Sequence, residues 1–209
     1  MRVAIIGASA LGKQLRHLLL SLPKQFEFVG FYDDYAPEGG EVLGKTSTVV
    51  ADYQRGRFDS VLIGVGYNAY LFRTLIRKRL QEARIPLATV IHPTAYVDPT
   101  AKIGEGCVLL PYVIIDQYVE LGANCFLSLR ASISHESKIG ADTYIAPAAV
   151  ICGHCTIGPS CFLGANTTVR DDTIITEGVV IGCGAVVVKN IADFGVYGGC
   201  PAKKIKVQR

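Results

Sequence analysis

The sequence predicts a chain of two parts, an α/β unit followed by a parallel β-helix. The β-helix is predicted from a six-residue period, because every sixth residue from Ile91 to Val187 is Ile, Leu or Val. Four residues after each of these positions, from Ala95 to Ala185, every side chain is small or β-branched. The α/β unit is predicted from apolar strands and helices that alternate before residue 88. A fixed short period is typical of a repeat architecture.

The first unit is expected to span residues 1–88. A buried strand is predicted over 2–6, followed by a glycine turn and an apolar helix that Pro23 ends. Further strands are predicted over 26–32 and 60–65, and a second helix over 68–83. This order is typical of a Rossmann-like fold, with room for one mononucleotide-binding half.

The glycine turn of the first unit places backbone N–H groups and a helix N-terminus where an anion can bind. Two carboxylates follow the second strand and are suited to a ribose or a base. The alternative is that the glycines only permit a tight turn, and the turn alone does not decide between the two. The predicted substrate-binding residues are Gly7, Ala8, Ser9, Gly12, Asp33, Asp34, Gly64 and Asn68.

The second helix of the first unit is strongly basic. We interpret its cations as a solvated face. They are Arg73, Arg77, Lys78, Arg79 and Arg84.

The second unit is expected to span residues 89–193. One hexad makes a short strand and a corner, so that three hexads close one triangular coil and the coils stack by parallel pairing. The large aliphatic side chain and the small side chain two positions before it both point into the coil. Each coil contacts only its neighbours. Residues 194–209 leave the period and are predicted to form a C-terminal cap and a basic tail.

Charge and composition exclude several classes of function. A net charge of +3 is modest and argues against nucleic-acid binding as the main role. No stretch of about 18 apolar residues predicts a membrane span, and the start does not read as a signal peptide, so a cytoplasmic enzyme is expected. Cys152 and Cys155 have metal-site spacing but occupy different hexad positions, so no metal site is expected.

Two histidines, His135 and His154, lie at corner positions of the repeat, where side chains point outward. Because three hexads make one coil, Gly153 lies directly above His135. A glycine there allows a ligand to approach the backbone, and its N–H can donate to the oxyanion of an acyl transfer. The repeat therefore predicts a base beside an oxyanion donor.

The repeat segments Ile157-Gly158-Pro159-Ser160-Cys161 and Ile181-Gly182-Cys183-Gly184-Ala185 resemble those of the hexapeptide-repeat acyltransferases, whose repeats form a left-handed parallel β-helix. The segment from Gly198 to Lys206 resembles the C-terminal signature of CoA-dependent members. The two-unit layout with Ser134-His135-Glu136 resembles the branch that acetylates amino groups of nucleotide-linked sugars, alongside sialic acid O-acetyltransferases.

The resemblance implies a mechanism of direct transfer, in which the sugar amine attacks the thioester of acetyl-CoA. It implies that His135 is the general base, that Glu136 orients it, and that the first unit binds the sugar nucleotide. Acetyl-CoA is expected along the β-helix between subunits of a homotrimer, with no metal. The implied cofactor-binding residues are Gly153, Ala165, Cys183, Pro201, Lys203 and Tyr144.

Three positions depart from the family pattern. Tyr144 stands where many relatives carry a second histidine, Ala10-Leu11 stands where relatives often have Gly-His, and Cys183 replaces a common glycine. The leading hypothesis is an acetyl-CoA-dependent N-acetyltransferase of a nucleotide-linked amino sugar. The alternatives are a sialic-acid-type O-acetyltransferase and a non-catalytic, trimeric nucleotide-binding scaffold.

The trimer also has support from the pattern of aromatic residues. Phe126, Tyr144 and Phe162 are each separated by three hexads and should form one outward stripe that needs cover from another surface. Packing under the first unit is the alternative cover.

Overall fold

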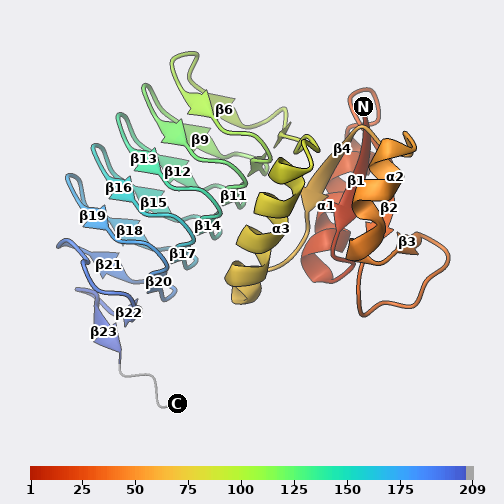
Figure 1. Cartoon of the computed structure of the whole chain (residues 1–209). Helices are drawn as coiled ribbons and strands as arrows, with labels where there is room; N and C mark the ends of the chain where they lie inside the picture. Colours follow the sequence, from red (N-terminus) through yellow and green to blue (C-terminus); the bar gives the residue numbers. More distant parts are fainter. Residues whose placement is uncertain (206–209) are drawn as a thin grey trace. The chain divides into compact units, whose positions relative to one another are not determined.

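A computed structural model describes residues 1–205, apart from the side chains of Asn68 and Tyr70 (Figure 1). The chain divides into two compact units, Met1–Thr89 and Val90–Arg209. An α/β unit followed by a parallel β-helix is the predicted fold, and the structure confirms it. None of the described helices is long and apolar enough to cross a membrane.

The first unit is built on a parallel sheet of four strands in the order β3-β2-β1-β4. Helix α1 packs on β1 and β2, and α3 packs on β4. The strands are β1 (Arg2–Ile6), β2 (Glu27–Tyr32), β3 (Val42–Gly44) and β4 (Ser60–Ile63). The helices are α1 (Ala10–Ser21), α2 (Val49–Gln54) and α3 (Tyr70–Glu82), with short 3₁₀ turns η1 (Thr46–Thr48) and η2 (Tyr67–Ala69).

Two features of the first unit differ from the sequence prediction. Strand β3 and helix α2 were not predicted, because neither carries enough periodic residues to stand out. Arg73 does not belong to a solvated face, since it is 2% exposed. Its guanidinium donates to the carbonyls of Val65 (2.7 Å) and Ile63 (3.3 Å), so it fastens α3 to the end of β4.

The second unit contains seventeen two-residue strands, β5 to β21, that stack into three flat faces (Figure 1). The first face holds β5 (Val90–Ile91), β8 (Val108–Leu109), β11 (Phe126–Leu127), β14 (Tyr144–Ile145), β17 (Phe162–Leu163) and β20 (Val180–Ile181). The second face holds β6 (Tyr96–Val97), β9 (Ile114–Ile115), β12 (Ser132–Ile133), β15 (Val150–Ile151), β18 (Thr168–Val169) and β21 (Val186–Val187). The third face holds β7 (Lys102–Ile103), β10 (Glu120–Leu121), β13 (Lys138–Ile139), β16 (Thr156–Ile157) and β19 (Ile174–Ile175).

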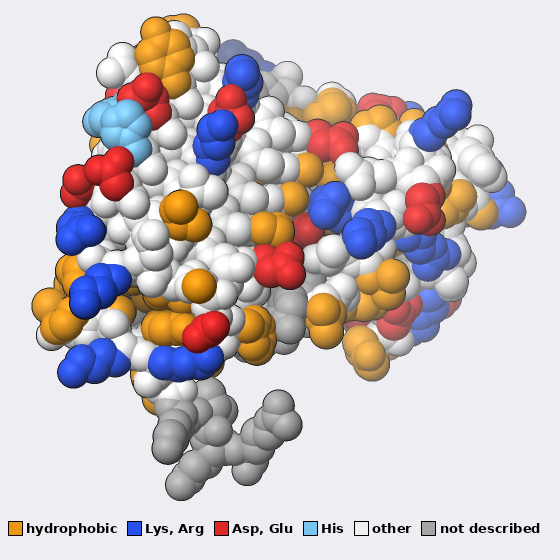
Figure 2. Space-filling view, turned by 60° about the vertical axis from the view of Figure 1, so that its left-hand side comes forward, with side chains coloured by type: hydrophobic (Ala, Val, Ile, Leu, Met, Phe, Trp, Pro, Cys, Tyr) orange, Lys and Arg blue, Asp and Glu red, His pale blue; other side chains and the backbone are white. Residues whose placement is uncertain are grey.

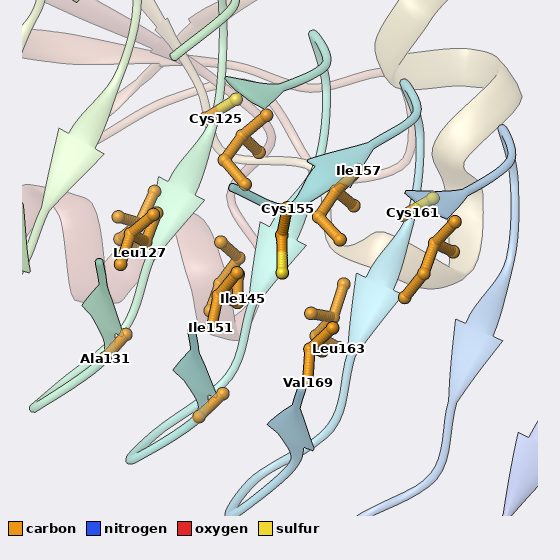
Figure 3. Close-up of a cluster of buried hydrophobic side chains, with 14 of the residues drawn as sticks. Cys125, Leu127, Ala131, Ile145, Ile151, Cys155, Ile157, Cys161, Leu163 and Val169 are labelled. Carbon is orange, nitrogen blue, oxygen red and sulfur yellow. The ribbon is translucent and has the colours of Figure 1, made fainter. Parts of the chain in front are cut away.

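Each strand pairs in parallel with the strand one full coil later, without a register shift from Val90 to Val187. The large aliphatic side chains fill the centre of the prism (Figure 3). Cysteines and other small residues fill the space beside them, as predicted. The buried cysteines are Cys107, Cys125, Cys155 and Cys161.

The corners of the β-helix share one backbone conformation. From residue 106 to residue 184, the third residue after each inward aliphatic side chain has a φ between 55° and 73°, in the left-handed region. Glycine occupies this position only at 106, 178 and 184. Elsewhere a side chain accepts the strain because the ladders on both sides fix the backbone. Glu136 (φ 58°) and His154 (φ 57°) are two of these corner residues.

The C-terminal segment adds two strands to the first face. Strand β22 (Val196–Gly198) continues the parallel stack on β20, and β23 (Lys203–Ile205) returns antiparallel to it. The Cys200–Pro201 peptide bond between them is cis. Residues 206–209 of the predicted cap and tail lie outside the described residues.

The β-helix core supplies a test of the fold. Ile145 is fully buried, whereas Ile174 lies on the third face with 53% exposure. Ile145→Ala should lower the free energy of unfolding by about 2–5 kcal/mol, since it leaves a cavity between coils. The matched Ile174→Ala should change it by less than about 0.5 kcal/mol. Thermal or chaotrope unfolding followed by circular dichroism measures both, and equal losses would contradict the inward assignment.

Candidate functional site

A cavity of about 500 Å³ opens in the first unit at the carboxyl ends of the parallel strands. Ligands of open α/β sheets bind at this edge. Four predicted substrate-binding residues line the cavity, namely Gly7, Ser9, Asp33 and Asp34. The remaining wall is largely apolar and comes from Ile6, Tyr32, Tyr35, Thr46, Val65, Gly66, Ala69 and Phe72.

The glycine turn opens into the start of α1. Ser9 holds the N-cap position with an extended backbone and makes no side-chain capping bond. Because Ser9 also lines the cavity, the start of the 12-residue helix lies at the cavity edge without a side-chain cap. A phosphate group suits such a place because the N-terminal end of a helix is electropositive.

The two predicted carboxylates hold the cavity wall together. Asp33 accepts hydrogen bonds from the N–H groups of Ala8 (2.7 Å), Tyr35 (2.8 Å) and Ala36 (2.9 Å). Burial alone would raise the pKa of Asp33, but these donors hold it below its usual value. Asp34 accepts from the N–H (2.9 Å) and hydroxyl (2.8 Å) of Thr46. Both side chains therefore shape the loop as well as line the cavity.

Three of the predicted glycines pack against one another beneath the turn. A Cβ on Gly12 would overlap the carbonyl oxygen of Gly7, and a Cβ on Gly64 would lie 2.7 Å from Gly12 Cα. Gly7 itself has a φ of 101°, which favours glycine. Gly12 and Gly64 thus let α1 approach β1 and β4 closely. The backbone of Asn68 belongs to η2, and its side chain lies outside the described residues.

In the β-helix, His135 lies against Gly153 of the next coil. A Cβ at residue 153 would lie 2.6 Å from Cε1 and 2.7 Å from Nε2 of the imidazole, so only glycine leaves room for the ring. The side chain of His135 is 41% exposed. No acceptor for the Gly153 N–H is found among the described residues. This corner joins the second and third faces, between β12 and β13.

Glu136 lies between two histidines at this corner. Its Oε2 is 3.3 Å from Nδ1 of His135 and 3.3 Å from Nε2 of His154. The two imidazole rings meet edge to face, with centroids 4.9 Å apart. Figure 2 shows exposed histidine side chains lying among acidic ones. The corner can therefore hold a base, an orienting carboxylate and a second imidazole.

Two buried cysteines of the β-helix, Cys155 and Cys161, are not suited to nucleophilic chemistry. Cys155 is fully buried, and burial raises the pKa of its thiol, which donates to the carbonyl of Arg170 at 3.1 Å. Burial likewise raises the pKa of Cys161 to about 11. Within residues 1–205, the group of potential metal ligands found is His135, Glu136 and His154, without a cysteine.

The other predicted cofactor-binding residues lie elsewhere in the chain. Ala165 and Cys183 stack on the corner between the first and second faces, where the Gly184 N–H donates to the Ala165 carbonyl at 2.8 Å. Pro201 and Lys203 are exposed in the C-terminal segment beside β22. One chain thus carries the corner at Ala165 and Cys183 and the His135 corner on opposite edges of its second face.

Tyr144 stands on the first face, away from the His135 corner. Its ring stacks between Phe126 (4.7 Å between centroids) and Phe162 (5.5 Å). The predicted stripe therefore exists. Phe126 is only 2% exposed within the chain, so the stripe alone does not argue for a second subunit.

Two parts of the site escaped the sequence prediction. The pairing of Glu136 with His154 follows from the same step of one full coil that pairs His135 with Gly153, so the repeat itself carries the signal for it. The apolar cavity wall, including Thr46 and Phe72, comes from loops and a helix with no repeat. The long loop after the second strand could have indicated this wall, because loops at the carboxyl ends of parallel strands form the ligand-binding edge of the sheet.

Known proteins resemble both the repeat and the whole chain. The family model described as the GMPPB C-terminal domain matches residues 91–192. The acetyltransferase domain of PglB from Neisseria gonorrhoeae is 28% identical, with a TM-score of 0.89, over 98% of this chain and 99% of that one. That domain has also been solved in complex with acetyl coenzyme A.

PerB from Caulobacter crescentus, solved with CoA and GDP-perosamine, is 26% identical. Its TM-score is 0.86, over 98% of this chain and 97% of that chain. WeeI from Acinetobacter baumannii shares the fold at 22% identity, with a TM-score of 0.75, over 98% of this chain and 100% of that chain. The likeness in each case includes both units.

The glycine packing beneath the cavity gives a test. Gly12→Ala should lower the free energy of unfolding by about 1–3 kcal/mol, because the new methyl overlaps the Gly7 carbonyl. Gly66→Ala is the matched control, since a Cβ there meets nothing within 4 Å. Thermal unfolding of both variants measures the difference. An unchanged melting temperature in Gly12→Ala would contradict the close packing of α1.

Proposed function

We propose that this chain, whose repeat and fold are those of the hexapeptide-repeat acyltransferases of the left-handed β-helix type, is an acetyl-CoA-dependent N-acetyltransferase of a nucleotide-linked amino sugar. The observation that carries the proposal is the His135 corner, where an imidazole, a carboxylate and an N–H without an acceptor among the described residues converge. The complexes of the similar proteins with acetyl coenzyme A and with GDP-perosamine support the choice of both substrates.

In the proposed reaction, the sugar amine attacks the carbonyl carbon of the thioester. His135 removes a proton from the amine, and Glu136, facing Nδ1, orients the ring so that Nε2 is available as the base. The Gly153 N–H donates to the oxyanion of the tetrahedral intermediate. Collapse of the intermediate breaks the C–S bond, and the proton held by His135 passes to the departing CoA thiolate. The products are the N-acetyl sugar nucleotide and CoA.

The cavity of the first unit is the proposed site for the nucleotide. Its volume of about 500 Å³ lies in the range of small-molecule sites. The diphosphate is placed at the uncapped start of α1, beside Gly7 and Ser9. Asp34 is placed near the ribose or base, with Tyr35 and Phe72 offering apolar surface for a base.

We further propose that the active unit is a homotrimer with a shared site. Acetyl-CoA that reaches both His135 and the corner at Ala165 and Cys183 must meet these residues from two different chains, because in one chain they lie on opposite edges of the second face. Exposed apolar side chains on that face support a covered interface. They are Tyr96, Ile114 and Val150.

The general base is tested by replacing His135. His135→Asn should lower turnover by roughly 10²–10⁴-fold, because general-base catalysis contributes that much. His92→Asn is the matched control, since His92 contacts Thr94 at the first coil. The assay measures CoA release and the acetylated product with UDP-, GDP- and dTDP-linked amino sugars. Turnover that survives in His135→Asn contradicts the assignment of the base.

The same assay separates the alternative functions. Activity on a sialic acid but on no amino sugar would favour the O-acetyltransferase. A folded trimer that binds a nucleotide but no acetyl-CoA would favour the scaffold.

The shared site is tested by subunit mixing. His135→Asn and Cys183→Trp should each be inactive alone, the second because the indole blocks the exposed corner. After the two variants are unfolded and refolded together in equal amounts, activity should return to roughly a quarter of the wild-type rate. Half of the chains carry an intact His135 and half carry an intact corner at Cys183, so about one shared site in four has both. Cys183→Ser is the control that keeps the corner open. Mixed oligomers without recovered activity would place the whole site within one chain.

A further inference from the structure

We propose that His135, Glu136 and His154 bind a divalent transition-metal ion such as Zn²⁺, and that the bound ion inhibits the enzyme. The ligand atoms of these three side chains all lie within 4.8 Å of one another. Two imidazoles and one carboxylate are a common ligand set for zinc. The inhibition rests on the proposed role of His135, whereas the binding of the ion does not.

Two of the three distances between ligand atoms in the cluster are those that a zinc ion requires. Zinc bonds to nitrogen and oxygen of about 2.0–2.1 Å in a tetrahedral site place neighbouring ligand atoms about 3.3–3.4 Å apart. Oε2 of Glu136 lies 3.3 Å from each of the two histidine nitrogens. An ion can therefore enter after small side-chain rotations, with a water molecule as its fourth ligand.

The backbone holds these ligands in place before any ion arrives. Glu136 and His154 occupy the same corner position on successive coils, with φ of 58° and 57°. The His154 N–H donates to the carbonyl of His135 at 3.0 Å, which ties the two coils together at the site. The contact with Gly153 fixes the face of the His135 ring. A site on such a rigid scaffold loses little conformational entropy on binding.

The chemistry of the cluster also selects the class of cation. Imidazole nitrogens favour Zn²⁺, Co²⁺, Ni²⁺ and Cu²⁺, whereas Mg²⁺ prefers oxygen ligands in an octahedron. Asp171 and Asp172 follow on the next coil, where the Asp172 N–H donates to the Gly153 carbonyl at 3.1 Å. Their negative charges on the same corner favour the approach of a cation.

A bound ion would stop the proposed reaction in two ways. It occupies the Nδ1 lone pair of His135 and breaks the contact with Glu136. With Nδ1 bound to the ion, the single N–H proton of the neutral ring lies on Nε2, which then has no lone pair with which to act as the base. The water on the open position also takes the space of the sugar amine. Inhibition should therefore be reversible, and a chelator should relieve it.

Binding is tested on the full chain, freed of metal with a chelator and desalted, by titration with Co²⁺. Tetrahedral or five-coordinate Co²⁺ gives visible absorption that Zn²⁺ should abolish by competition. His154→Asn and Glu136→Gln should each weaken Co²⁺ affinity by roughly 10–100-fold. His92→Asn should bind Co²⁺ as the wild type does, and Mg²⁺ should not compete.

A different pattern of binding would overturn the site. Unchanged Co²⁺ affinity in His154→Asn would do so. Binding that disappears only when the thiols are alkylated would also do so, because it would place the ion on the exposed cysteines at 183 and 200. Circular dichroism of each variant separates loss of a ligand from loss of the fold.

Inhibition is measured as formation of acetylated sugar by mass spectrometry, because released CoA itself binds Zn²⁺ through its thiol. Each variant is normalised to its own metal-free rate. The Zn²⁺ concentration for half inhibition should rise roughly tenfold or more in His154→Asn and stay unchanged in His92→Asn. Binding of Co²⁺ and Zn²⁺ without inhibition would overturn the inhibitory half of the proposal and place the base elsewhere. Absence of binding would overturn the metal site, whatever the outcome for acetyl transfer.

Discussion

The parallel backbone ladder of the β-helix is the constraint on which the site depends. Each strand pairs with the strand three hexads later, so every residue from Val90 to Val187 lies over a defined neighbour. That pairing puts Gly153 over His135 and His154 over Glu136, although a full coil of chain separates the members of each pair. A corner side chain is therefore positioned by hydrogen bonds that it does not itself make.

The two units differ in how far the sequence foretells them. In the β-helix, an exact period predicted the coils, the inward cysteines and the neighbour of His135. There the spacing along the sequence determines which residues lie next to one another in space. In the first unit, strand β3, helix α2 and the buried Arg73 depend on contacts between distant segments. No local sequence pattern marks such contacts. The apolar pattern therefore predicted the helices and strands with long apolar runs and did not predict the short strand β3 and the short helix α2.

The two candidate binding regions are also built in different ways. The cavity of the first unit is held by side chains that already have internal partners, such as Asp33 with three backbone donors. These bonds keep the loop open at the carboxyl ends of the strands and give a ligand a preformed wall. At the His135 corner, the side chains of His135, Glu136 and His154 are half exposed and contact one another. The first arrangement suits the ligand recognition that we propose for the cavity, and the second suits the proposed proton transfer by His135.

The left-handed corners have a consequence for how this protein can evolve. Eleven non-glycine residues from Tyr112 to Asp172 hold a positive φ, so the backbone tolerates many side chains there without changing its path. Substitution at a corner is therefore a cheap route to new chemistry. Insertion of a single residue is more disruptive, because it would shift every later coil against the earlier ones. An insertion between His135 and Gly153 would also separate these two residues. Lineages of this fold are thus expected to diversify by exchange of corner residues, or by gain and loss of whole coils.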